Sequence, residues 1–448
     1  MISQTTEYIE RFYEVISQKD INAASVLIAD LHPADIAELY ANLNVEGRKF
    51  IYSLLDDEKA ADVFAELDDD LQKELVDVMP ANVVAKRFLD NMDTDDAVDL
   101  FRELDEKKQE EILSHIDDVE QAGGIVDLLK YDEETAGGIM GTEMVVVNEE
   151  WSMPKCLEEM RTQAEEMDEI YYVYVVDNEE RLKGVFPLKK MITSPSISKV
   201  KHVMRKEPIS VRVDTSVDDV IKIIEKYDLV ALPVVDSIGR LEGRITIDDV
   251  MDRVREQAER DYQLASGISQ DVETKDNVLM QTYARLPWLL IGMVGGISNS
   301  AILGNFENNF LAYPAMAFFI PLIGGTGGNV GIQSSAIVVQ GLANKTLNIK
   351  NVWSQVFKES AVSLINAGII SLVVFLYNYF TMGPSVITAS VSLSLFAVVM
   401  FASIFGTLVP LTLEKFKIDP AIATGPFITI SNDIIGMLIY MSITLSLS

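Results

Sequence analysis

Five long hydrophobic segments occupy the C-terminal part of the chain, near 284–304, 314–342, 354–380, 386–413 and 421–447. Each is long enough for a helix that crosses a bilayer, which needs about 20 residues. Gly and Pro are frequent within them, as is usual for membrane helices. Because so few charged residues interrupt these segments, a soluble helical core is a poor alternative. We predict a transmembrane domain of five helices over residues 281–448.

The charged residues lie mainly in the rest of the chain. The sequence has 69 acidic and 37 basic residues, of which only five acidic and six basic residues lie in 281–448. Residues 1–280 therefore carry a net charge of −33, whereas that of the whole chain is −32. An acidic surface repels phosphate groups, so we expect no nucleic-acid partner.

Basic residues in the loops after the second and fourth hydrophobic segments predict the orientation: Lys345, Lys350, Lys415 and Lys417. Loops rich in lysine stay on the cytoplasmic side. The N-terminal part is then cytoplasmic, the C-terminus is outside, and the chain is a multi-pass protein of the cytoplasmic membrane in contact with lipid. The start, Met1–Phe12, is polar and indicates no signal peptide. A single cysteine, Cys156, fits a reducing compartment and is expected to be a buried residue.

Residues 1–130 show a helical repeat. The segments Leu31–Leu39, Asp57–Leu67 and Thr94–Leu104 resemble one another, and their apolar residues recur at spacings of three and four. Each such helix has one buried face. We predict an acidic, all-α domain of stacked helices, in which many acids cap helix N-termini.

Residues 131–247 contain a second repeat, of α/β type. Val175–Gly184 matches Val234–Gly243 at a separation of 59 residues, and each copy reads as a strand, a polar turn and a strand before a helix. A duplicated unit of this size resembles a tandem pair of cystathionine-β-synthase-type (CBS) domains, at about 139–200 and 201–247.

That resemblance implies a nucleotide site. In CBS domains, a Gly-x-x-Thr/Ser-x-x-Asp stretch commonly holds a ribose. The second copy has this pattern, with Thr246 and Asp249, whereas the first has Pro187 and Lys190 at the matching positions. ATP is therefore a candidate ligand of the pair, at the second copy.

Residues 248–280 connect the two parts of the chain. Asp248–Asn277 is polar throughout and predicts one long helix that leads into the first membrane segment. A helix at this junction is well placed to move with the soluble domains. The alternative is an ordinary solvated linker.

An enzyme is not indicated. His32, His115 and His202 are widely separated, and the sequence has no His-Glu-x-x-His, Cys-x-x-Cys or Walker motif. The glycine-rich run Gly324–Asn329 lies within a membrane segment and has no lysine after it, so it does not resemble a phosphate-binding loop.

The same run predicts a break in the second membrane helix. Irregular backbone is tolerated at membrane depth where it lines a water-filled cavity, and its carbonyl groups can then bind ions. We expect Gly328 and Asn329 to contribute to a pore in this way. The alternative is that the glycines form a surface for close helix packing.

Asp433 is the most informative residue of the last segment. A carboxylate at the middle of a membrane helix costs about 2.5–3.5 kcal/mol on insertion scales, and such residues commonly mark an ion path. Asn432 adjoins it, and Thr429 lies one turn earlier. Asp419 is expected at the cytoplasmic end of the same helix, about 21 Å away at helical rise. An ion pair between Asp419 and Arg285 is the alternative for that acid.

The ligands available in this part of the chain are carboxylate, amide, hydroxyl and carbonyl oxygens, which suit Mg²⁺ rather than zinc or copper. One central aspartate in each chain is little charge for a divalent cation. A symmetric homodimer would bring two copies of Asp433 together.

The motifs described so far occur together in one family. The segment Leu31–Leu39, the run Tyr131–Met140, the CBS pair, Pro321–Ser334 and Asp419–Asp433 follow one another in the order found in the MgtE family of magnesium channels and transporters, which this chain resembles over nearly its whole length. The resemblance implies a cytosolic Mg²⁺ sensor, a connecting plug helix, and a pore formed by five spans from each subunit of a homodimer. It also implies that Asp433 binds the pore ion and that Asp419 lies near the entrance.

The acidic charge suggests how the pore is gated. Acidic surfaces that face one another repel, and Mg²⁺ bound between them would hold the domains together and close the pore. Our hypothesised sensor ligands are Asp248, Asp249, Asp252, Glu256 and Glu259 near the plug helix, with Asp95, Asp96 and Asp228 across the domain faces. The alternatives are a broader divalent-cation (Co²⁺, Mn²⁺) transporter, a coupled exchanger, or a nucleotide sensor with a membrane anchor.

Overall fold

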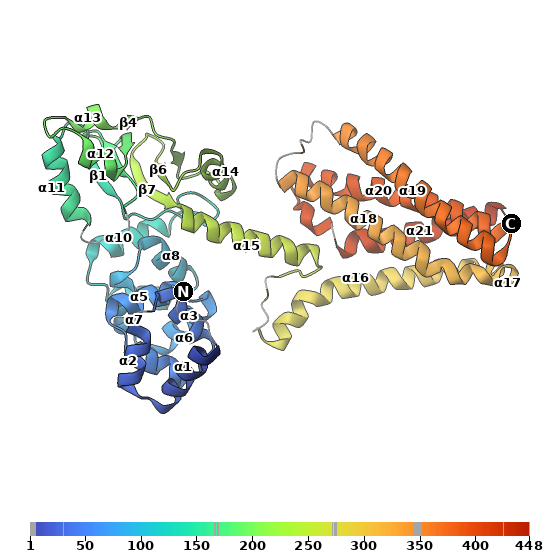
Figure 1. Ribbon diagram of the computed structural model, residues 1–448, viewed down its shortest axis with the longest axis horizontal. Coiled ribbons are helices and arrows are strands. Elements are labelled where there is room, and N and C mark those ends of the chain that lie inside the picture. The colour runs from blue at the N-terminus through green and yellow to red at the C-terminus, as the bar shows by residue number, and fades with distance from the viewer. Residues whose placement is uncertain are drawn as a thin grey trace. The chain divides into compact units, whose positions relative to one another are not determined.

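The chain folds into two compact units, Met1–Val254 and Arg255–Ser448, which are described separately (Figure 1). The computed structural model describes residues 6–29, 31–164, 167, 170–270, 272, 276–343, 347, 352–423 and 425–447. It confirms the predicted combination of an all-α N-terminal domain, a CBS pair with α/β sheets, a connecting helix and five candidate membrane spans.

The N-terminal domain consists of short helices (blue to cyan in Figure 1). They are α1 (Thr6–Gln18), α2 (Ile21–Ala29), α3 (Pro33–Ala41), α4 (Val45–Tyr52), α5 (Asp57–Ala65), α6 (Asp69–Val78), α7 (Ala81–Arg87), the 3₁₀ turn η1 (Leu89–Asn91), α8 (Thr94–Arg102), α9 (Glu106–Leu113) and α10 (Val119–Leu128). Several of the acids cap helices. The side chains of Asp56, Asp105 and Asp118 accept hydrogen bonds from backbone N–H groups in the first turns of α5, α9 and α10.

A glutamine side chain binds the end of the preceding helix in two copies of the helical repeat. Gln72 Nε2 donates to the carbonyl oxygens of Phe64 and Leu67 at the end of α5, and Gln109 Nε2 donates in the same way to those of Phe101 and Leu104 at the end of α8. Each glutamine satisfies carbonyl groups that have no partner within their own helix. The two glutamines therefore help to fix how α5 turns into α6 and how α8 turns into α9.

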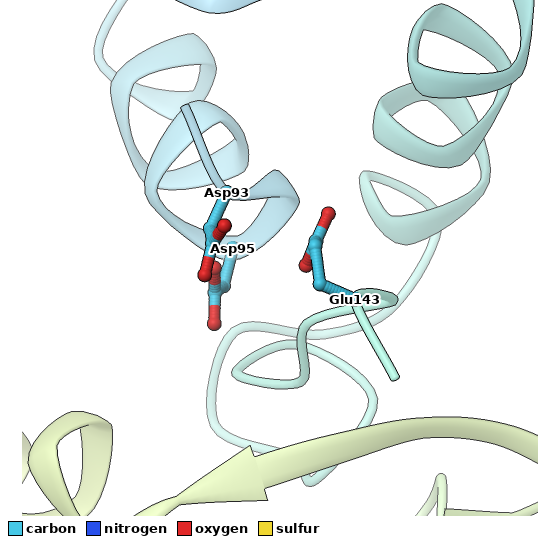
Figure 2. Close-up of side chains that lie close together, drawn as sticks. All are labelled: Asp93, Asp95 and Glu143. Carbon is cyan, nitrogen blue, oxygen red and sulfur yellow. The ribbon is translucent and has the colours of Figure 1, made fainter. Parts of the chain in front are cut away.

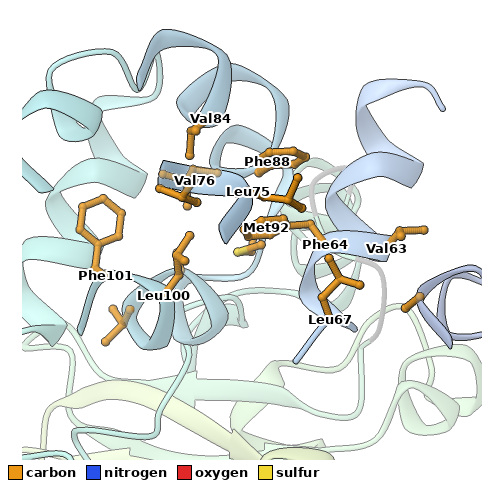
Figure 3. Close-up of a cluster of buried hydrophobic side chains, with 14 of the residues drawn as sticks. Val63, Phe64, Leu67, Leu75, Val76, Val84, Phe88, Met92, Leu100 and Phe101 are labelled. Atoms are coloured by element: carbon orange, nitrogen blue, oxygen red, sulfur yellow. The ribbon is translucent and has the colours of Figure 1, made fainter. Parts of the chain in front are cut away.

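Apolar side chains from successive helices form one continuous core (Figure 3). Phe64 of α5 stacks on Phe88, with ring centroids 4.3 Å apart, and Leu100 and Phe101 of α8 are buried in the same cluster. Each short helix is stable only with its neighbours, because an isolated helix of this length is marginal in water. The position of α8, which begins with the acids described below, is thus set by the stack.

The CBS pair contains two small sheets. The first has the order β1 (Val145–Asn148), β2 (Val173–Val176), β3 (Leu182–Phe186) and β4 (Arg205–Lys206), and the second has the order β5 (Val211–Arg212), β6 (Ala231–Val235) and β7 (Leu241–Thr246). The helices between them are α11 (Met153–Gln163), α12 (Leu188–Thr193), α13 (Val200–Val203) and α14 (Val217–Tyr227). Cys156 is buried in α11, and burial raises the pKa of its thiol to about 11, which fits the expected structural role.

The 59-residue repeat is visible in the turns of the two sheets. Asp177 accepts hydrogen bonds from the backbone N–H groups of Glu179 and Arg181, and Asp236 accepts them from those of Ile238 and Arg240. The ladder between the two hairpin strands is irregular at the matching place in both copies. The sequence match therefore reflects two copies of one local structure.

The connecting helix is shorter than predicted. α15 spans Ile247–Ala265 and is followed by a turn, so Asp248–Asn277 is not one helix. Gly267 has a φ of +78°, and the N–H of Ile268 donates to the carbonyl of Gln263. This is the glycine-terminated helix end known as a Schellman motif, and the left-handed conformation stops the helix.

The second unit contains the hydrophobic segments as helices. They are α16 (Val278–Asn305), α17 (Glu307–Ala312), η3 (Pro314–Phe319), α18 (Ile320–Ala343), α19 (Val352–Met382), α20 (Val386–Lys415), η5 (Pro420–Ala423) and α21 (Pro426–Leu447). Five helical segments are long and apolar enough to cross a membrane, as predicted. The loop lysines Lys345 and Lys350, on which the predicted orientation partly rests, lie outside the described residues.

α20 is the central helix of this unit and packs against α18, α19 and α21. The predicted break at Gly324–Asn329 is wrong, because α18 is a regular helix through this run. A β-carbon at Gly327 would lie 2.8 Å from Val398 Cγ1 of α20, and one at Gly406 of α20 would collide with the carbonyl group of Gly331. These glycines serve close helix packing, which was the alternative considered for the run.

Candidate ion-binding sites

A cavity of about 310 Å³ opens beside Asp433 in the second unit. Four of the predicted pore residues line it together, although they come from two helices: Asp433 and Thr429 on α21, and Gly328 and Asn329 on α18. The other lining residues are Asn299, Ile320, Pro321, Gly324, Gly325, Ile332 and Met437. The cavity thus combines one carboxylate with amide and hydroxyl oxygens, which are ligands that hard cations prefer.

The glycines of α18 let its backbone approach the carboxylate. A β-carbon at Gly324 would lie 3.3 Å from Asp433 Oδ1, and one at Gly328 would lie 3.3 Å from Thr429 Cγ2. Larger side chains on this face would narrow the space in front of Asp433. The glycine run therefore has two uses, since Gly327 and Gly331 pack against other helices while Gly324 and Gly328 leave room at the acid.

Asn299 is a lining residue that the sequence did not point out. It lies on α16, and its Oδ1 atom is buried without a hydrogen-bond partner among the described residues. In the sequence, Asn299 is a single amide side chain within an apolar segment. Such residues are common in membrane helices, so this one did not identify a site. Its orientation toward the cavity became evident only from the fold.

Two of the predicted pore residues lie elsewhere. Asn432 is buried against α18, where its Nδ2 donates to the carbonyl of Gly327, and it does not line the cavity. Asp419 is exposed and precedes the separate turn η5, so it is not on the same helix as Asp433. Its Oδ1 accepts a hydrogen bond from the N–H of Ala421, and no ion pair joins it to Arg285 among the described residues.

A larger cavity, of about 810 Å³, shares Thr429 and Ile332 with the first. The end of α15, the start of α16 and the start of α21 line it, with Arg285, Trp288 and Pro426 among the residues on its wall. The Arg285 guanidinium donates to Gln281 Oε1 within α16. The two cavities are therefore neighbours along α21.

A cluster of acids lies in the first unit, where the N-terminal domain contacts the CBS pair (Figure 2). Asp93 and Asp95 are at the start of α8, and Glu143 faces them from the loop before β1. Each offers a carboxylate oxygen, and these oxygens lie within 4.8 Å of one another. Glu143 is held in place because its carboxylate accepts hydrogen bonds from Thr94 N and Thr94 Oγ1.

The electrostatics of this cluster are unfavourable without a cation. Burial raises the pKa of Asp95 well above its ordinary value, and repulsion from Asp249, Asp96 and Glu143 raises it further. Although the side chain of Asp96 is exposed at the surface, desolvation by the surrounding protein and repulsion from Asp93 raise its pKa to about 8. Both shifts mean that desolvation, and with it mutual repulsion, destabilises the ionised cluster.

The structure brings only some of the predicted sensor residues to this cluster. Asp95 belongs to it. The charges of Asp96 and Asp249 raise the pKa of Asp95, and the charges of Asp248 and Asp249 raise the pKa of Asp96. Asp93 and Glu143 were missed, because acids are common at helix starts and in loops throughout this sequence.

The other predicted ligands are not at the cluster. Asp228 is an exposed residue that ends α14 in a left-handed conformation, with a φ of +49°. Asp252, Glu256 and Glu259 are exposed on α15, and Glu259 accepts a hydrogen bond from Arg255 at 3.2 Å.

The predicted nucleotide ligands have a local structural role. Thr246 donates from its Oγ1 to Asp249 Oδ2 at 2.6 Å, and its backbone N–H donates to the same oxygen at 2.8 Å. A cavity of about 420 Å³ lies instead between the two CBS copies and is lined by residues that include Tyr172, Lys190 and Arg205. Neither Thr246 nor Asp249 lines it, whereas Pro187 and Lys190, where the first copy departs from the motif, both do.

Five candidate membrane helices, three of which line a cavity that contains a carboxylate, are joined by one helix to a soluble part with an acidic cluster, and this combination is typical of a membrane transport protein for cations. Comparisons with known proteins agree. Residues 31–134 match the family described as "MgtE intracellular N domain", residues 136–195 and 200–256 match CBS domains, and residues 320–443 match the family described as "Divalent cation transporter".

The similarity to characterised relatives extends over nearly the whole chain. It is 31% identical to the magnesium transporter MgtE of Thermus thermophilus over 96% of each chain. It is 33% identical to the magnesium transporter MgtE of Enterococcus faecalis, over 96% of this chain and 95% of the relative. The chain therefore belongs to the MgtE family, which confirms the resemblance and the expectation that it is a transporter rather than an enzyme.

Two solved structures resemble the soluble part. One is described as the soluble part of a magnesium transporter; it is 32% identical, with a TM-score of 0.52, and covers 56% of this chain and 98% of that one. The other is the cytosolic domain of the Mg²⁺ channel MgtE in complex with ATP; it is 31% identical, with a TM-score of 0.51, and covers 55% of this chain and 99% of that one.

Proposed function

We propose that this protein is a channel-like importer of Mg²⁺ in the cytoplasmic membrane, and that intracellular Mg²⁺ closes it by binding at the acidic cluster. The single observation that carries the transport proposal is Asp433 on the wall of a cavity within the membrane-spanning unit. In this arrangement the N-terminal domains are cytoplasmic and the C-terminus is outside.

The size and chemistry of the cavity support hydrated Mg²⁺ as the ion. Mg²⁺ is reluctant to lose its six octahedral water molecules and is commonly held by one or two carboxylates. At about 30 Å³ for each water, this shell needs about 180 Å³, and the cavity measures about 310 Å³. Asp433 would attract the ion, and the amide and hydroxyl groups of Asn329 and Thr429 would bind its water molecules.

A homodimer would complete the site. A single Asp433 neutralises half of the charge of a divalent cation, and a twofold axis near α21 would supply a second carboxylate. The exposed apolar faces of α16, whose span is only 6% buried within one chain, offer surface for lipid or for a second subunit. Cross-linking in the native membrane, with a cysteine introduced on α16, tests this assembly.

The acidic cluster is suited to the regulatory ion. Asp93, Asp95 and Glu143 supply hard oxygen ligands from two separate domains, so a cation bound there would hold the domains together. A β-carbon at Gly141 would lie 2.8 Å from Asp95 Oδ2 and 3.0 Å from Glu143 Oε2. The glycine thereby leaves a space between the two acids.

A route from the regulatory site to the pore follows the chain. Asp248 and Asp249, which act on the cluster, are at the start of α15, and the end of α15 packs against the start of α21. A β-carbon at Gly267 would lie 2.6 Å from Pro426 Cγ. A displacement of α15 would thus reach the helix that carries Asp433.

Ion flux into proteoliposomes tests the proposal. Asp433→Asn keeps the size of the side chain and removes its charge, and we expect it to reduce Mg²⁺ flux at least tenfold, since one lost charge interaction of about 1.4 kcal/mol already changes a rate by that factor. Glu307→Gln, which removes an exposed acid outside the cavity, is the matched control. Equal flux through Asp433→Asn and wild type would reject the proposed pore site.

Comparison of Mg²⁺ with Co²⁺ and Mn²⁺ separates this function from a broader divalent-cation transporter, and dependence on a second ion would indicate a coupled exchanger.

We also propose that a nucleotide such as ATP binds in the cavity between the CBS copies. Tyr172 offers an aromatic face for a base, and Lys190 and Arg205 offer positive charge for phosphates. The similar cytosolic domain solved with ATP supports this choice of ligand. It replaces the site first expected at Thr246 and Asp249.

A further inference from the structure

Arg253 lies in the first half of the connecting helix α15, and its side chain contacts the N-terminal domain. Its Nη2 donates to both carboxylate oxygens of Asp99 on α8, at 3.1 and 3.3 Å. Its Nη1 lies 3.6 Å from Oε1 of Glu133, in the segment between α10 and β1. One guanidinium group therefore joins α15 to α8 and to the segment that leads into the CBS pair.

Asp99 is held in position for this contact by a second arginine. Arg102, at the end of α8, donates from its Nη1 to Asp99 Oδ1 and to the backbone carbonyl of Gly138, each at 3.0 Å. The side chains of Arg102 and Arg253 are only 15% and 20% exposed, while Asp99 is about half exposed. Because the protein shields both cations from water, these ion pairs contribute more than pairs on an open surface.

The contact lies beside the acidic cluster on α8. Asp95 and Asp99 are four residues apart, so they are neighbours on the surface of this helix. Asp95 is repelled by Asp249 of α15, whereas Asp99 is bound by Arg253 of the same helix. The two helices therefore meet through one repulsive contact, which a bound cation would relieve, and one attractive contact that needs no ion.

We propose that Arg253 is a positioning residue that holds α15 on α8 without Mg²⁺, and that it thereby sets the Mg²⁺ concentration at which the two helices come together. The second statement rests on the regulatory site of the proposed function. A guanidinium group keeps its charge throughout the physiological pH range, so the contact with Asp99 is always available. Mg²⁺ then supplies only the remaining free energy, and the cluster responds to a lower concentration than it would without Arg253.

Hydrogen exchange of the full-length protein without Mg²⁺ tests the contact itself. Arg253→Met keeps the length of the side chain but removes its charge and its donors, so exchange in α8 and the first half of α15 should accelerate about fivefold, as for a partly exposed ion pair. Arg255→Met is the matched control, because Arg255 pairs with Glu259 of its own helix. Arg253→Lys retains the charge and should recover most of the protection. Equal exchange in Arg253→Met and Arg255→Met would overturn the proposal.

Titration with Mg²⁺ tests the effect on the regulatory site. Arg253→Met and Asp99→Asn should each raise the midpoint of Mg²⁺-dependent protection about fivefold, and the double variant should raise it no further, because both remove the same contact. If Arg253 merely repelled the ion, Arg253→Met would lower the midpoint; that result, or additive effects in the double variant, would overturn the proposal. If Mg²⁺ does not protect wild type, the proposed regulatory site and the second statement fail together, while the comparison without Mg²⁺ still decides whether Arg253 holds the helices.

Discussion

Gly267 and Pro426 lie against each other where the connecting helix ends and the last membrane helix begins. Gly267 has a left-handed backbone, and a β-carbon there would lie 2.6 Å from Pro426 Cγ. Gly425, the residue before, contacts the carbonyl group of Ala265 just as closely. This junction joins the helix that begins near the acidic cluster to the helix that carries Asp433.

Gly267→Ala should weaken this junction. A left-handed conformation costs a non-glycine residue about 1–2 kcal/mol, and the collision with Pro426 adds about 1–3 kcal/mol for overpacking. Hydrogen exchange of the last turn of α15 should therefore accelerate. Gly383→Ala is the matched control, because Gly383 has a similar φ of +73° with open space around it. Equal effects of the two substitutions would show that the contact with Pro426 contributes nothing.

Asp95→Asn should stabilise the first unit in the absence of Mg²⁺ and make it less responsive to the ion. The substitution removes a carboxylate that is repelled by Asp249, Asp96 and Glu143, and it also removes one ligand. We expect slower hydrogen exchange of α8 without Mg²⁺ and less additional protection when Mg²⁺ is added. Glu110→Gln, an exposed acid on α9, is the control. Undiminished protection by Mg²⁺ in Asp95→Asn would exclude the proposed regulatory site.

The stability of the first unit without Mg²⁺ should fall as the pH rises from about 4 to about 8. The pKa of Asp96 is raised to about 8 in the folded protein, whereas the unfolded chain releases this proton near pH 4. Between these values the folded state holds more protons than the unfolded state, so increasing pH favours unfolding. Hydrogen exchange of α8 across this range measures the effect. Mg²⁺ should stabilise α8 more at pH 8 than at pH 5, where protons compete for the carboxylates; a pH-independent effect of Mg²⁺ would contradict this.

Lys190→Ala and Arg205→Ala should each weaken ATP binding by about tenfold, because a charge-assisted hydrogen bond contributes about 1.5–3 kcal/mol. Calorimetric titration of the full-length protein measures the affinity. Thr246→Val, which removes a hydroxyl outside the cavity, should bind ATP as wild type does. A loss of binding in Thr246→Val alone would restore the site expected from the sequence motif.

Local patterns were sufficient for several features. The five hydrophobic segments became helices because their length and apolar composition leave few other possibilities, and the matched turns at Asp177 and Asp236 follow from identical short-range hydrogen bonds. Asp433 was recognised because a carboxylate in an apolar segment is rare. The family order of motifs added the function, which none of these patterns contains alone.

Tertiary structure decided which side chains meet. A run of glycines is compatible with a broken helix and with close packing of an intact one. In α18 the glycines pack closely against Val398 and Gly406 of α20, and the helix continues through the run. The acids that form the cluster of the first unit could not be told apart in the sequence, because 64 of the 69 acids lie in residues 1–280. Only the stacking of α8 on the CBS pair brought Asp93 and Asp95 to Glu143, and only the packing of α15 beside α8 brought Arg253 to Asp99. Contacts between residues distant in sequence depend on how whole helices pack, which a local pattern does not encode.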